Sequence, residues 1–442
     1  MTATGGPDAT IRAHLTALFQ AAVDAARAET ALPEHLPTPA PGGRILLLGA
    51  GKAAGAMAEV AERVYRERDG LGPDRLSGLC VTRHGYGRPT RWIEIIEAGH
   101  PVPDQAGVAA SARTLALAAA AGPRDQIVVL LSGGGSANWV APVAGVSLAD
   151  KQALTRALLA SGATIDEINT VRRHLSRIKG GRLAAARGSG AALTTLAISD
   201  VPRDDPAAIA SGPTVADPTT LEDARAIVAR HAPDAPDSIH RALNDTVNET
   251  PKPGDPVFDG TDYRIIARPA LSLAAAAETA RSLGYTPIML GDSLEGEARE
   301  VAAEHARRAL QLARDGTRAV LLSGGELTVT LRGDGSGGPN QEYALALALA
   351  LEGHPAISAV AGDTDGTDGG SGAASDPAGA FIDPTTLGRA ARLGHDAAVF
   401  LARNDSTGFF NALGDLLRPG PTHTNVNDFR AVIIDKAERS QP

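Results

Sequence analysis

Short apolar runs alternate with longer helical patterns along this chain, and this alternation limits the possible folds more than any other feature. One run, residues 44–48, is apolar from Ile45 onward, as is typical of a strand buried on both faces of a sheet. It leads through the turn Gly49–Gly51 into a helical pattern over Lys52–Arg68. Further runs lie at Gly78–Thr82, Ile93–Glu97, Gln126–Leu131 and Leu193–Ser199, and further helical patterns at Ile11–Glu29, Gln105–Ala120, Leu148–Ser161 and Thr164–Lys179. This order predicts an α/β fold with a doubly wound domain.

A loop-rich segment with five prolines, roughly residues 233–260, interrupts the alternation. We therefore predict two domains, at residues 1–245 and 246–442. The expected strands of the second domain are Arg264–Ala267, Thr286–Leu290, Arg318–Leu322, Leu327–Leu331, Ile357–Ala361 and Ala431–Ile434, and its expected helices are Leu271–Leu283, Leu294–Ala313 and Gln341–Leu351. The second domain is thus predicted to be α/β as well.

Composition excludes several classes of function. The chain has 42 basic and 51 acidic residues, no basic block and 3% aromatic residues, which argues against nucleic acid as a partner. Its one cysteine, Cys80, rules out an internal disulfide and fits a reducing cytosol. No apolar run approaches the roughly 18 residues of a membrane span, and Met1–Thr10 lacks the apolar core of a signal peptide. We expect a cytoplasmic protein with a small-molecule substrate and no membrane partner; whether it forms homo-oligomers stays open.

Lysine is rare in this chain and lies beside glycine at two places. Five of the 42 basic residues are lysine, and two of them are Lys52 and Lys179. Arginine replaces lysine on an exposed surface but not where a compact ammonium must meet a phosphate as a point charge. The two lysines therefore point to a phosphate-handling enzyme, with chance as the alternative.

The first glycine turn, Gly49–Gly55, joins a strand to a helix and offers helix N–H groups to an anion. Its spacing, G-x-G-x-x-x-G, is one residue away from the dinucleotide fingerprint, and it is not a Walker A loop. The next strand ends at Thr82-Arg83 instead of an acidic residue. Because Arg83 suits a 2′-phosphate, binding of NADP stays open beside binding of a nucleotide phosphate, and a plain turn is the structural alternative.

A second turn places three successive glycines after a strand. Ser132, Gly133, Gly134, Gly135 and Ser136 can direct several backbone N–H groups and two hydroxyls at one point. Such a nest suits phosphate oxygens, although a tight structural turn is the alternative.

Two further small-residue turns add candidates for binding the cofactor. Lys179 precedes Gly180-Gly181, and Gly212 lies in Ala210-Ser211-Gly212-Pro213.

Carboxylates follow two other predicted strands. Asp200 ends one strand and is a candidate Mg²⁺ ligand. Asp363 and Asp365 lie in the acidic segment Gly362–Gly370, where an EF-hand fails because its twelfth position is Ala374. These two carboxylates either orient a substrate hydroxyl or Mg²⁺, or they form Asx turns in a solvated loop.

His100 is the remaining candidate from the residues alone. It stands before the stiff Pro101-Val102-Pro103 segment, and its role is either structural or in substrate binding.

Taken together, these motifs resemble the glycerate 2-kinase family, whose C-terminal half is the MOFRL domain and some of whose members are labelled hydroxypyruvate reductase. The resemblance extends over most of the chain. It rests on Gly49–Gly55, His100–Asp104, Leu131–Ala137, Glu167–Leu183, Ile198–Thr214, Leu322–Glu326, Gly337–Glu342, Gly362–Gly370 and Arg403–Phe429.

The resemblance implies ATP-dependent phosphorylation of D-glycerate at its 2-hydroxyl, with Mg²⁺. It also implies an N-terminal Rossmann-like domain, a C-terminal MOFRL-like α/β domain and an active site between them. Lys52 matches the lysine proposed to be catalytic in the family. The hypothesis assigns Ser132–Ser136 to the ATP phosphates, and Asp200 or Asp363 and Asp365 to Mg²⁺.

The same hypothesis places a cation and several polar residues on the substrate. Arg172 or Arg403 holds the glycerate carboxylate, and His100 and Asn340 complete the substrate site. One departure matters, because many members read G-G-R-N-Q-E where this chain has Pro339 before Asn340. Proline supplies neither a charge nor an N–H. Either Arg332 or Arg403 replaces the missing cation, or the substrate preference differs.

Two alternatives come from other classes. An NAD(P)H-dependent hydroxypyruvate reductase is the enzymatic one, disfavoured by the imperfect fingerprint and the missing ribose-binding acid. A regulatory nucleotide- or sugar-acid-binding module is the other, and ATP turnover would eliminate it.

Overall fold

The computed structural model describes residues 8–370, 373 and 375–435 of the chain. The chain divides into two compact units, Ala28–Ile266 and a second unit made of residues 1–27 and 267–442. These limits differ from the sequence-based domains at residues 1–245 and 246–442 in two respects. The first helix belongs to the second unit, and the strand that ends at Ala267 completes the sheet of the first.

The unit Ala28–Ile266 is built on a six-stranded sheet of order β3-β2-β1-β4-β5-β6. Each recorded strand pair from β3 to β5 is parallel. The strands are β1 (Ile45–Ala50), β2 (Leu76–Arg83), β3 (Ile93–Ala98), β4 (Gln126–Leu131), β5 (Ala192–Ile198) and β6 (Thr261–Ala267). Every residue of β1 is buried, as the apolar run predicted. The order reverses between β1 and β4, which makes their carboxyl ends a topological switch point.

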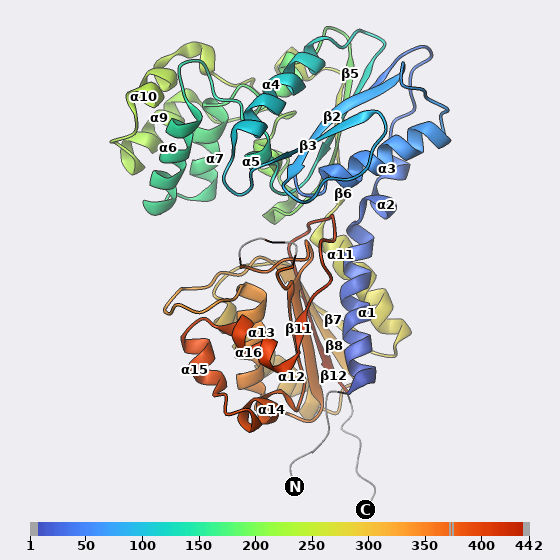
Figure 1. Ribbon diagram of the computed structural model, residues 1–442, viewed down its shortest axis with the longest axis vertical. Helices are drawn as coiled ribbons and strands as arrows, with labels where there is room; N and C mark the ends of the chain where they lie inside the picture. Colours follow the sequence, from blue (N-terminus) through green and yellow to red (C-terminus); the bar gives the residue numbers. More distant parts are fainter. Residues whose placement is uncertain (1–7, 371–372, 374, 436–442) are drawn as a thin grey trace, which may run out of the picture. The chain divides into compact units, whose positions relative to one another are not determined.

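Helices cover this sheet and form a bundle beside it. The helices are α2 (Ala28–Ala31), α3 (Ala54–Glu67), α4 (Gln105–Ala119), α5 (Gly135–Asn138), α6 (Leu148–Ala160), α7 (Ile165–His174), α8 (Arg182–Ala186), α9 (Leu221–His231) and α10 (Asp237–Asn244). In Figure 1, α6, α7, α9 and α10 gather in one group. Their shared core contains Leu154, Ile168, Val171 and Val228. This packing fixes α6 and α7, which supply cations to the site described below.

The second unit contains a mixed sheet of order β11-β10-β9-β12-β8-β7. β7 and β8 are parallel, whereas β12 runs antiparallel to both β8 and β9. The strands are β7 (Thr286–Leu294), β8 (Ala319–Gly325), β9 (Ile357–Asp363), β10 (Gly379–Ile382), β11 (Leu416–Leu417) and β12 (Asp428–Ile434). The helices are α1 (Ala9–Ala26), α11 (Pro269–Ser282), α12 (Ala298–Arg314), α13 (Pro339–Leu351), α14 (Thr386–Arg392), α15 (Ala397–Ala402) and α16 (Ser406–Leu413).

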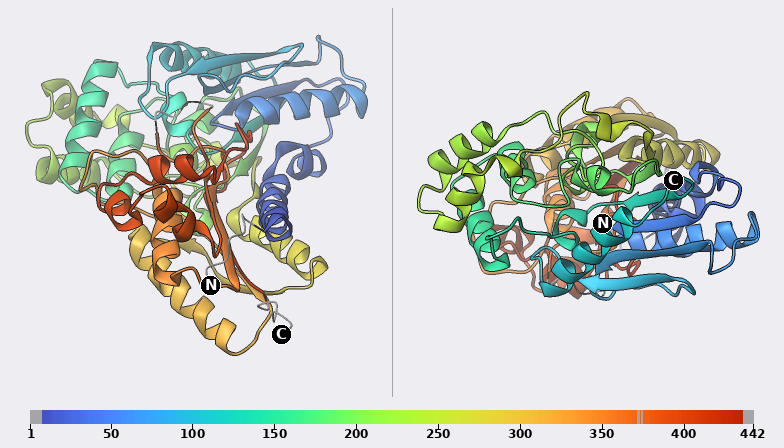
Figure 2. Two further views of the ribbon diagram at one scale, coloured as in Figure 1. Left: turned by 60° about the horizontal axis from the view of Figure 1, so that its bottom comes forward. Right: turned by 90° about the horizontal axis from the view of Figure 1, so that it is seen from above.

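Alternate residues of the central strands pack into the two hydrophobic cores, one on each face of this sheet. Leu321 and Val432 pack with α12 and α13, whereas Leu322 and Ile433 pack with α1 and α11. Figures 1 and 2 show α1 on the side of the sheet opposite α12. Helix α1 thus joins a unit whose other elements begin at residue 267.

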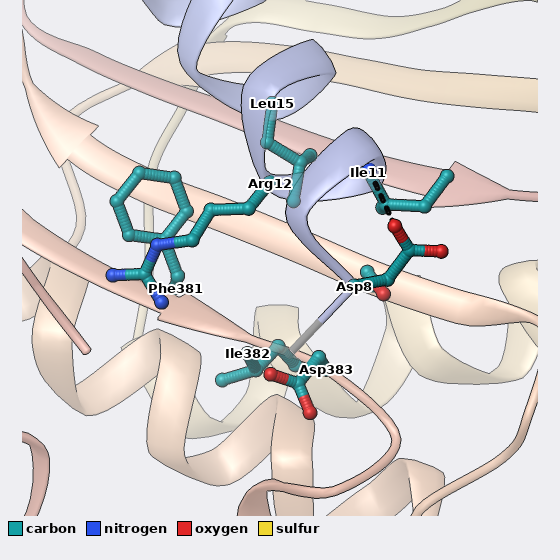
Figure 3. Close-up of a pocket in the computed structure, with 8 residues that line it drawn as sticks. Asp8, Ile11, Arg12, Leu15, Phe381, Ile382 and Asp383 are labelled. Atoms are coloured by element: carbon teal, nitrogen blue, oxygen red, sulfur yellow. Dashed lines mark hydrogen bonds between the residues drawn. The ribbon is translucent and has the colours of Figure 1, made fainter. Parts of the chain in front are cut away.

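The first turn of α1 is stabilised by an N-cap residue and by the side-chain contacts of Arg12. Asp8 accepts the amides of Thr10 and Ile11, and Arg12 lies over the ring of Phe381 at 4.4 Å (Figure 3). Arg12 also pairs with Asp415 at 2.8 Å. The hollow between these side chains measures about 10 Å³, room for about one water molecule and no substrate.

The structure corrects three sequence-based predictions of local structure. Residues 327–331 form no strand: Thr328 makes an isolated bridge to Glu297, and Leu331 is 78% exposed. The helix predicted over Thr164–Lys179 ends at His174: Leu175 leaves the helical conformation, and Ser176 makes an isolated bridge to Pro142. The segment predicted to be a loop, residues 233–260, contains α10. None of the described helices has the length and apolar character that a membrane span requires.

Candidate active site

The two glycine turns predicted from the sequence meet at the switch point. Lys52 follows β1, and its amide donates to the carbonyl of Gly133 after β4 at 2.8 Å. The Ser132 hydroxyl accepts the amide of Ala53 at 2.9 Å. The side chain of Lys52 thereby leaves from the turn before α3, not from the helix predicted over Lys52–Arg68.

Glycine is required in both turns because its φ is positive and neighbouring atoms occupy the space that a Cβ would need. Gly51 has φ +128°, and a Cβ built on it would lie 2.3 Å from the Ser132 Oγ. Gly134 has φ +83°, and a Cβ there would lie 2.8 Å from His100 Cδ2 and 3.3 Å from Lys52 Cγ. Three predicted site residues, Lys52, His100 and Gly134, are thus brought together.

The turn after β4 presents unpaired backbone donors. In the described part of the chain, the amides of Gly133, Gly134 and Ser136 donate to no protein acceptor. Gly134 is left-handed and Gly135 starts the short helix α5. Successive amides in such an arrangement form a concavity that suits an anion. This geometry agrees with the predicted nest.

The segment after β5 supports this nest. The Ser211 hydroxyl lies 2.7 Å from that of Ser136, and the Gly181 amide donates to the carbonyl of Gly212 at 2.7 Å. Ala210, Ser211 and Gly212 all have positive φ, at +50°, +60° and +61°. Left-handed backbone at Ala210 and Ser211 costs about 1–3 kcal/mol for each residue and is concentrated at functional sites.

A cavity of about 400 Å³ opens beside the nest. It brings together five predicted site residues, namely His100, Gly134, Ser136, Arg172 and Lys179. Its other lining residues are Pro101, Val102, Pro103, Ala137, Val140, Lys151, Gln152, Thr155, Arg156 and Leu159. No aspartate or glutamate is among these described lining residues, so the charged groups of the wall are all basic.

Two buried lysines stand in the cavity wall. The Lys179 ammonium donates to the carbonyl of Ser136 at 2.8 Å, and the Lys151 ammonium donates to the carbonyl of Leu175 at 2.8 Å. Burial, and then the charge of Arg172, lowers the pKa of Lys151 to about 7. Burial also lowers the pKa of Lys179 well below its ordinary value, with added repulsion from Lys151 and Arg172. Burial also lowers the pKa of Arg172.

Sequence reasoning missed Lys151 and Arg156. The scarcity of lysine, which drew attention to Lys52 and Lys179, applies equally to Lys151. Lys151 was not predicted as a site residue because it lies within an amphipathic helix pattern and has no glycine turn beside it.

The remaining predicted residues of this unit do not line the cavity. Ser132, Gly133, Gly135 and Gly212 form the backbone support behind it, through the contacts above. Asp200, half-buried after β5, is likewise absent from the lining.

In the second unit, the acidic segment folds on itself. Asp363 ends β9 and accepts the amide of Asp365 at 2.8 Å. Asp365 in turn accepts the amide of Thr367 at 2.8 Å and its hydroxyl at 3.0 Å. These are the Asx turns that the sequence left open as an alternative.

Asn340 belongs to a buried polar network. Its side-chain amide donates to Asp368 at 3.2 Å and to Asp428 at 2.6 Å. Burial, and then the charge of Asp428, raises the pKa of Asp368 to about 7. The Oδ1 of Asn340 is buried without a hydrogen-bond partner among the described residues.

Pro339 takes the first position of α13, where its missing N–H costs nothing. Two arginines were suggested to replace the missing cation. Arg332 lies close to Pro339 in sequence, and Arg403 lies in the same unit. Arg403 pairs with Asp334 at 3.1 Å, and both side chains are largely exposed. The amide of Arg332 donates to Asn404 at 2.7 Å.

The described residues contain no group of three or more His, Cys, Asp or Glu side chains arranged to hold a metal ion. Magnesium bound to substrate phosphates needs only one or two protein carboxylates, because water fills the other positions.

Fold and site define a class: a two-unit α/β protein with a cavity lined by basic side chains at the switch point of its parallel sheet. Comparison with known proteins narrows this class. Residues 14–244 match the family model described as "Domain of unknown function (DUF4147)", and residues 319–428 match the MOFRL family. The chain belongs to the glycerate 2-kinase family.

Individual relatives agree with this assignment but carry two kinds of name. A protein of Agrobacterium vitis, provisionally named a hydroxypyruvate reductase, is 48% identical over 434 residues, covering 97% of this chain and 95% of that protein. A glycerate 2-kinase of Pyrococcus horikoshii is 39% identical over 404 residues, which cover 89% of this chain and 88% of that protein. The crystal structure of a glycerate kinase from Thermotoga maritima matches with TM-score 0.85 and 36% identity, covering 97% of this chain and all of the other.

Proposed function

We propose that this protein is an enzyme that transfers the γ-phosphoryl group of ATP to the 2-hydroxyl of D-glycerate, giving 2-phosphoglycerate. The proposal rests chiefly on the cavity beside Ser132–Ser136, whose described lining residues include Lys151, Arg172 and Lys179 and no carboxylate. Phosphoryl transfer depends mainly on positioning and on neutralising phosphate charge. The names of the glycerate kinase relatives give the acceptor.

The donor set fits a polyphosphate. The unpaired amides of Gly133, Gly134 and Ser136 suit phosphate oxygens, and the buried ammonium of Lys179 adds charge beside them. The order β3-β2-β1-β4-β5-β6 places this donor set where Rossmann-like sheets bind nucleotides, which supports that assignment for the first unit.

Each remaining residue receives a role by proximity and chemistry. Lys52 neutralises the transferring phosphoryl group, because its side chain passes close to Gly134 and His100. Arg172 holds the acceptor's carboxylate in a bidentate pair, and His100 orients the acceptor.

Magnesium, when bound, would supply positive charge that neutralises the phosphate groups. Either Asp200 of the first unit, or Asp363 with Asp365 of the second, is proposed to hold it; Asp200 and Asp363 each follow or end a strand.

The contributions assigned to the second unit stay predictions. They are substrate contacts from Asn340, Asp363 and Asp365 and a catalytic cation at Arg403. The exposed ion pair of Arg403 with Asp334 would have to open before Arg403 reached a substrate. A cytoplasmic location is likewise proposed, in keeping with a single, buried cysteine.

The second candidate is an NAD(P)H-dependent hydroxypyruvate reductase, as the name of the Agrobacterium relative suggests. The turn after β1 lacks the dinucleotide spacing, and β2 ends at Arg83 where a ribose-binding acid would stand.

One pair of assays separates the two functions. ADP release with Mg-ATP and D-glycerate measures the kinase, and loss of nicotinamide absorbance with NADH or NADPH and hydroxypyruvate measures the reductase. We expect turnover only in the first. Turnover only in the second would reject the kinase.

A further inference from the structure

Lys151 is a buried lysine that makes no ion pair with any residue that the structure describes. It lies on α6, is 8% exposed and lines the cavity. One of its three ammonium donors meets the carbonyl of Leu175, the residue that ends α7. In the described part of the chain it has no carboxylate partner. A buried ammonium of this kind costs free energy that packing alone does not require.

The neighbours of Lys151 make its position less favourable still. Arg172 approaches from α7, and Lys179 from the turn that follows it. Arg156 of α6 and His100 line the same cavity, so each charged or titratable side chain of the lining is basic. Such a cluster is stabilised when an anion enters, which identifies it as a binding feature and not a stabilising one.

Charge and shape together identify the anion. A single carboxylate carries one negative charge, whereas Lys151, Arg172 and Lys179 offer up to three positive charges beside unpaired amides. The lining also has an apolar part, which includes Val102 and Leu159, 61% and 60% exposed. A polyphosphate joined to an apolar ring system matches both the basic and the apolar residues of the lining.

We propose that Lys151 binds phosphate oxygens of the nucleotide donor directly, together with Lys179 and Arg172, while the nucleoside packs on the apolar side of the cavity. This rests on the proposed function only in requiring a nucleotide as donor. Arg172 then meets phosphate in addition to, or in place of, the acceptor's carboxylate.

Calorimetric titration of the full-length protein tests this proposal. The probes are Mg-ADP, the Mg-complex of a non-hydrolysable ATP analogue and D-glycerate alone. Lys151→Met should weaken both nucleotides about tenfold to a hundredfold, the value of one charge-assisted hydrogen bond, and leave glycerate within about twofold. Lys252→Met is the matched control, because Lys252 pairs with Glu249 and is not among the residues that line the cavity. This variant should bind the two nucleotides and D-glycerate as the unaltered protein does. Nucleotide affinity unchanged in Lys151→Met, or loss of glycerate affinity alone, would overturn the proposal.

A second measurement, of proton uptake, separates binding from a merely structural role at the end of α7. Phosphate oxygens beside Lys151 favour its charged form, so nucleotide binding at pH 8 should take up protons. Titrations in two buffers of different ionisation enthalpy measure this uptake. Uptake that persists in Lys252→Met and falls in Lys151→Met supports direct contact, and no uptake in the unaltered protein contradicts it. Nucleotide binding that depends on Lys151 without phosphorylation of glycerate would reject the proposed function and leave this inference standing.

Discussion

The hydroxyl of Ser136 lies 2.7 Å from the hydroxyl of Ser211, which joins the nest after β4 to the left-handed segment after β5. Ser211 is fully buried and has φ +60°. A strained residue that places its hydroxyl on the nest indicates that the position of Ser136 matters to the site.

Removing the Ser211 hydroxyl should therefore impair catalysis more than folding. We expect Ser211→Gly to lower kcat/KM about tenfold or more, because small displacements of a positioned group are costly. Ser211→Ala should lose the same activity and be less stable than Ser211→Gly by about 1 kcal/mol, because alanine keeps the positive-φ strain. Steady-state kinetics and urea denaturation check both effects, and a fully active Ser211→Ala would show that the contact is only structural.

Lys52 should be needed for the chemical step. Lys52→Ala is expected to lower kcat with ATP and glycerate by about a hundredfold or more, with a smaller change in KM, because its charge acts mainly in the transition state. Lys52→Arg should not restore the rate, since a planar guanidinium does not replace a compact ammonium. A kcat within a few-fold of the unaltered enzyme in a folded Lys52→Ala variant would show that its assigned role is wrong.

Gly51 should tolerate no side chain. At φ +128° a Cβ would stand 2.3 Å from the Ser132 Oγ and 2.4 Å from its carbonyl oxygen. We expect Gly51→Ala to cost about 3 kcal/mol of stability and to abolish activity. Gly70→Ala is the matched control: Gly70 also has positive φ but nothing within 4 Å of its Cβ position, so it should lose about 1 kcal/mol and stay active. Equal losses in the two variants would contradict the close approach of the turns.

Lys151 should make the free energy of unfolding depend on pH in the range above pH 7. Its pKa is about 7 in the folded protein and near its ordinary value of 10.5 when unfolded, so between these values the unfolded chain holds the extra proton. The free energy of unfolding should therefore rise with pH through this window, by up to about 1.4 kcal/mol for each pH unit. Lys151→Met removes this contribution. Denaturation at pH 7, 8.5 and 10 should show a flatter profile for Lys151→Met than for Lys252→Met, and parallel profiles would show that folding does not lower the pKa of Lys151.

Asn340 should be indispensable as a donor between two carboxylates. Asn340→Asp would place a third carboxylate against Asp368 and Asp428, and we expect it to lower the free energy of unfolding by about 3 kcal/mol at pH 8. The loss should shrink at pH 5, where protonation relieves the repulsion. Asn411→Asp, at an exposed position on α16, should cost less than about 1 kcal/mol at both pH values. Similar losses in the two variants would show that the network around Asn340 is not required.

Those parts of the site that follow strand ends could be predicted from the sequence. The apolar runs that became β1 and β4 are continuous, and glycines follow each directly. Parallel strands place such turns at one edge, so Lys52 and Ser132–Ser136 could be expected to meet. Local sequence carries this information because buried strands and tight turns each demand particular residue types.

Features that depend on packing could not be predicted in this way. The local pattern around Lys151 is that of an amphipathic helix, but in the folded protein Lys151 is 8% exposed and donates to the carbonyl of Leu175. Helix α1 joins the second unit through contacts with α11 and β12, across more than 240 residues of sequence. The wrong strand at residues 327–331 has a local apolar pattern but no long neighbour to pair with, and its Leu327 amide turns to Asp428 instead.

The central claim is phosphoryl transfer from a nucleotide to a hydroxyl of glycerate. Phosphorus NMR of the full-length protein incubated with Mg-ATP and D-glycerate tests it most directly, because it resolves both the loss of the γ-phosphate and the position of the new ester. We expect ATP to be converted to ADP while 2-phosphoglycerate accumulates in an amount equal to the ATP consumed. Unchanged ATP, or inorganic phosphate as the sole new signal, would contradict it.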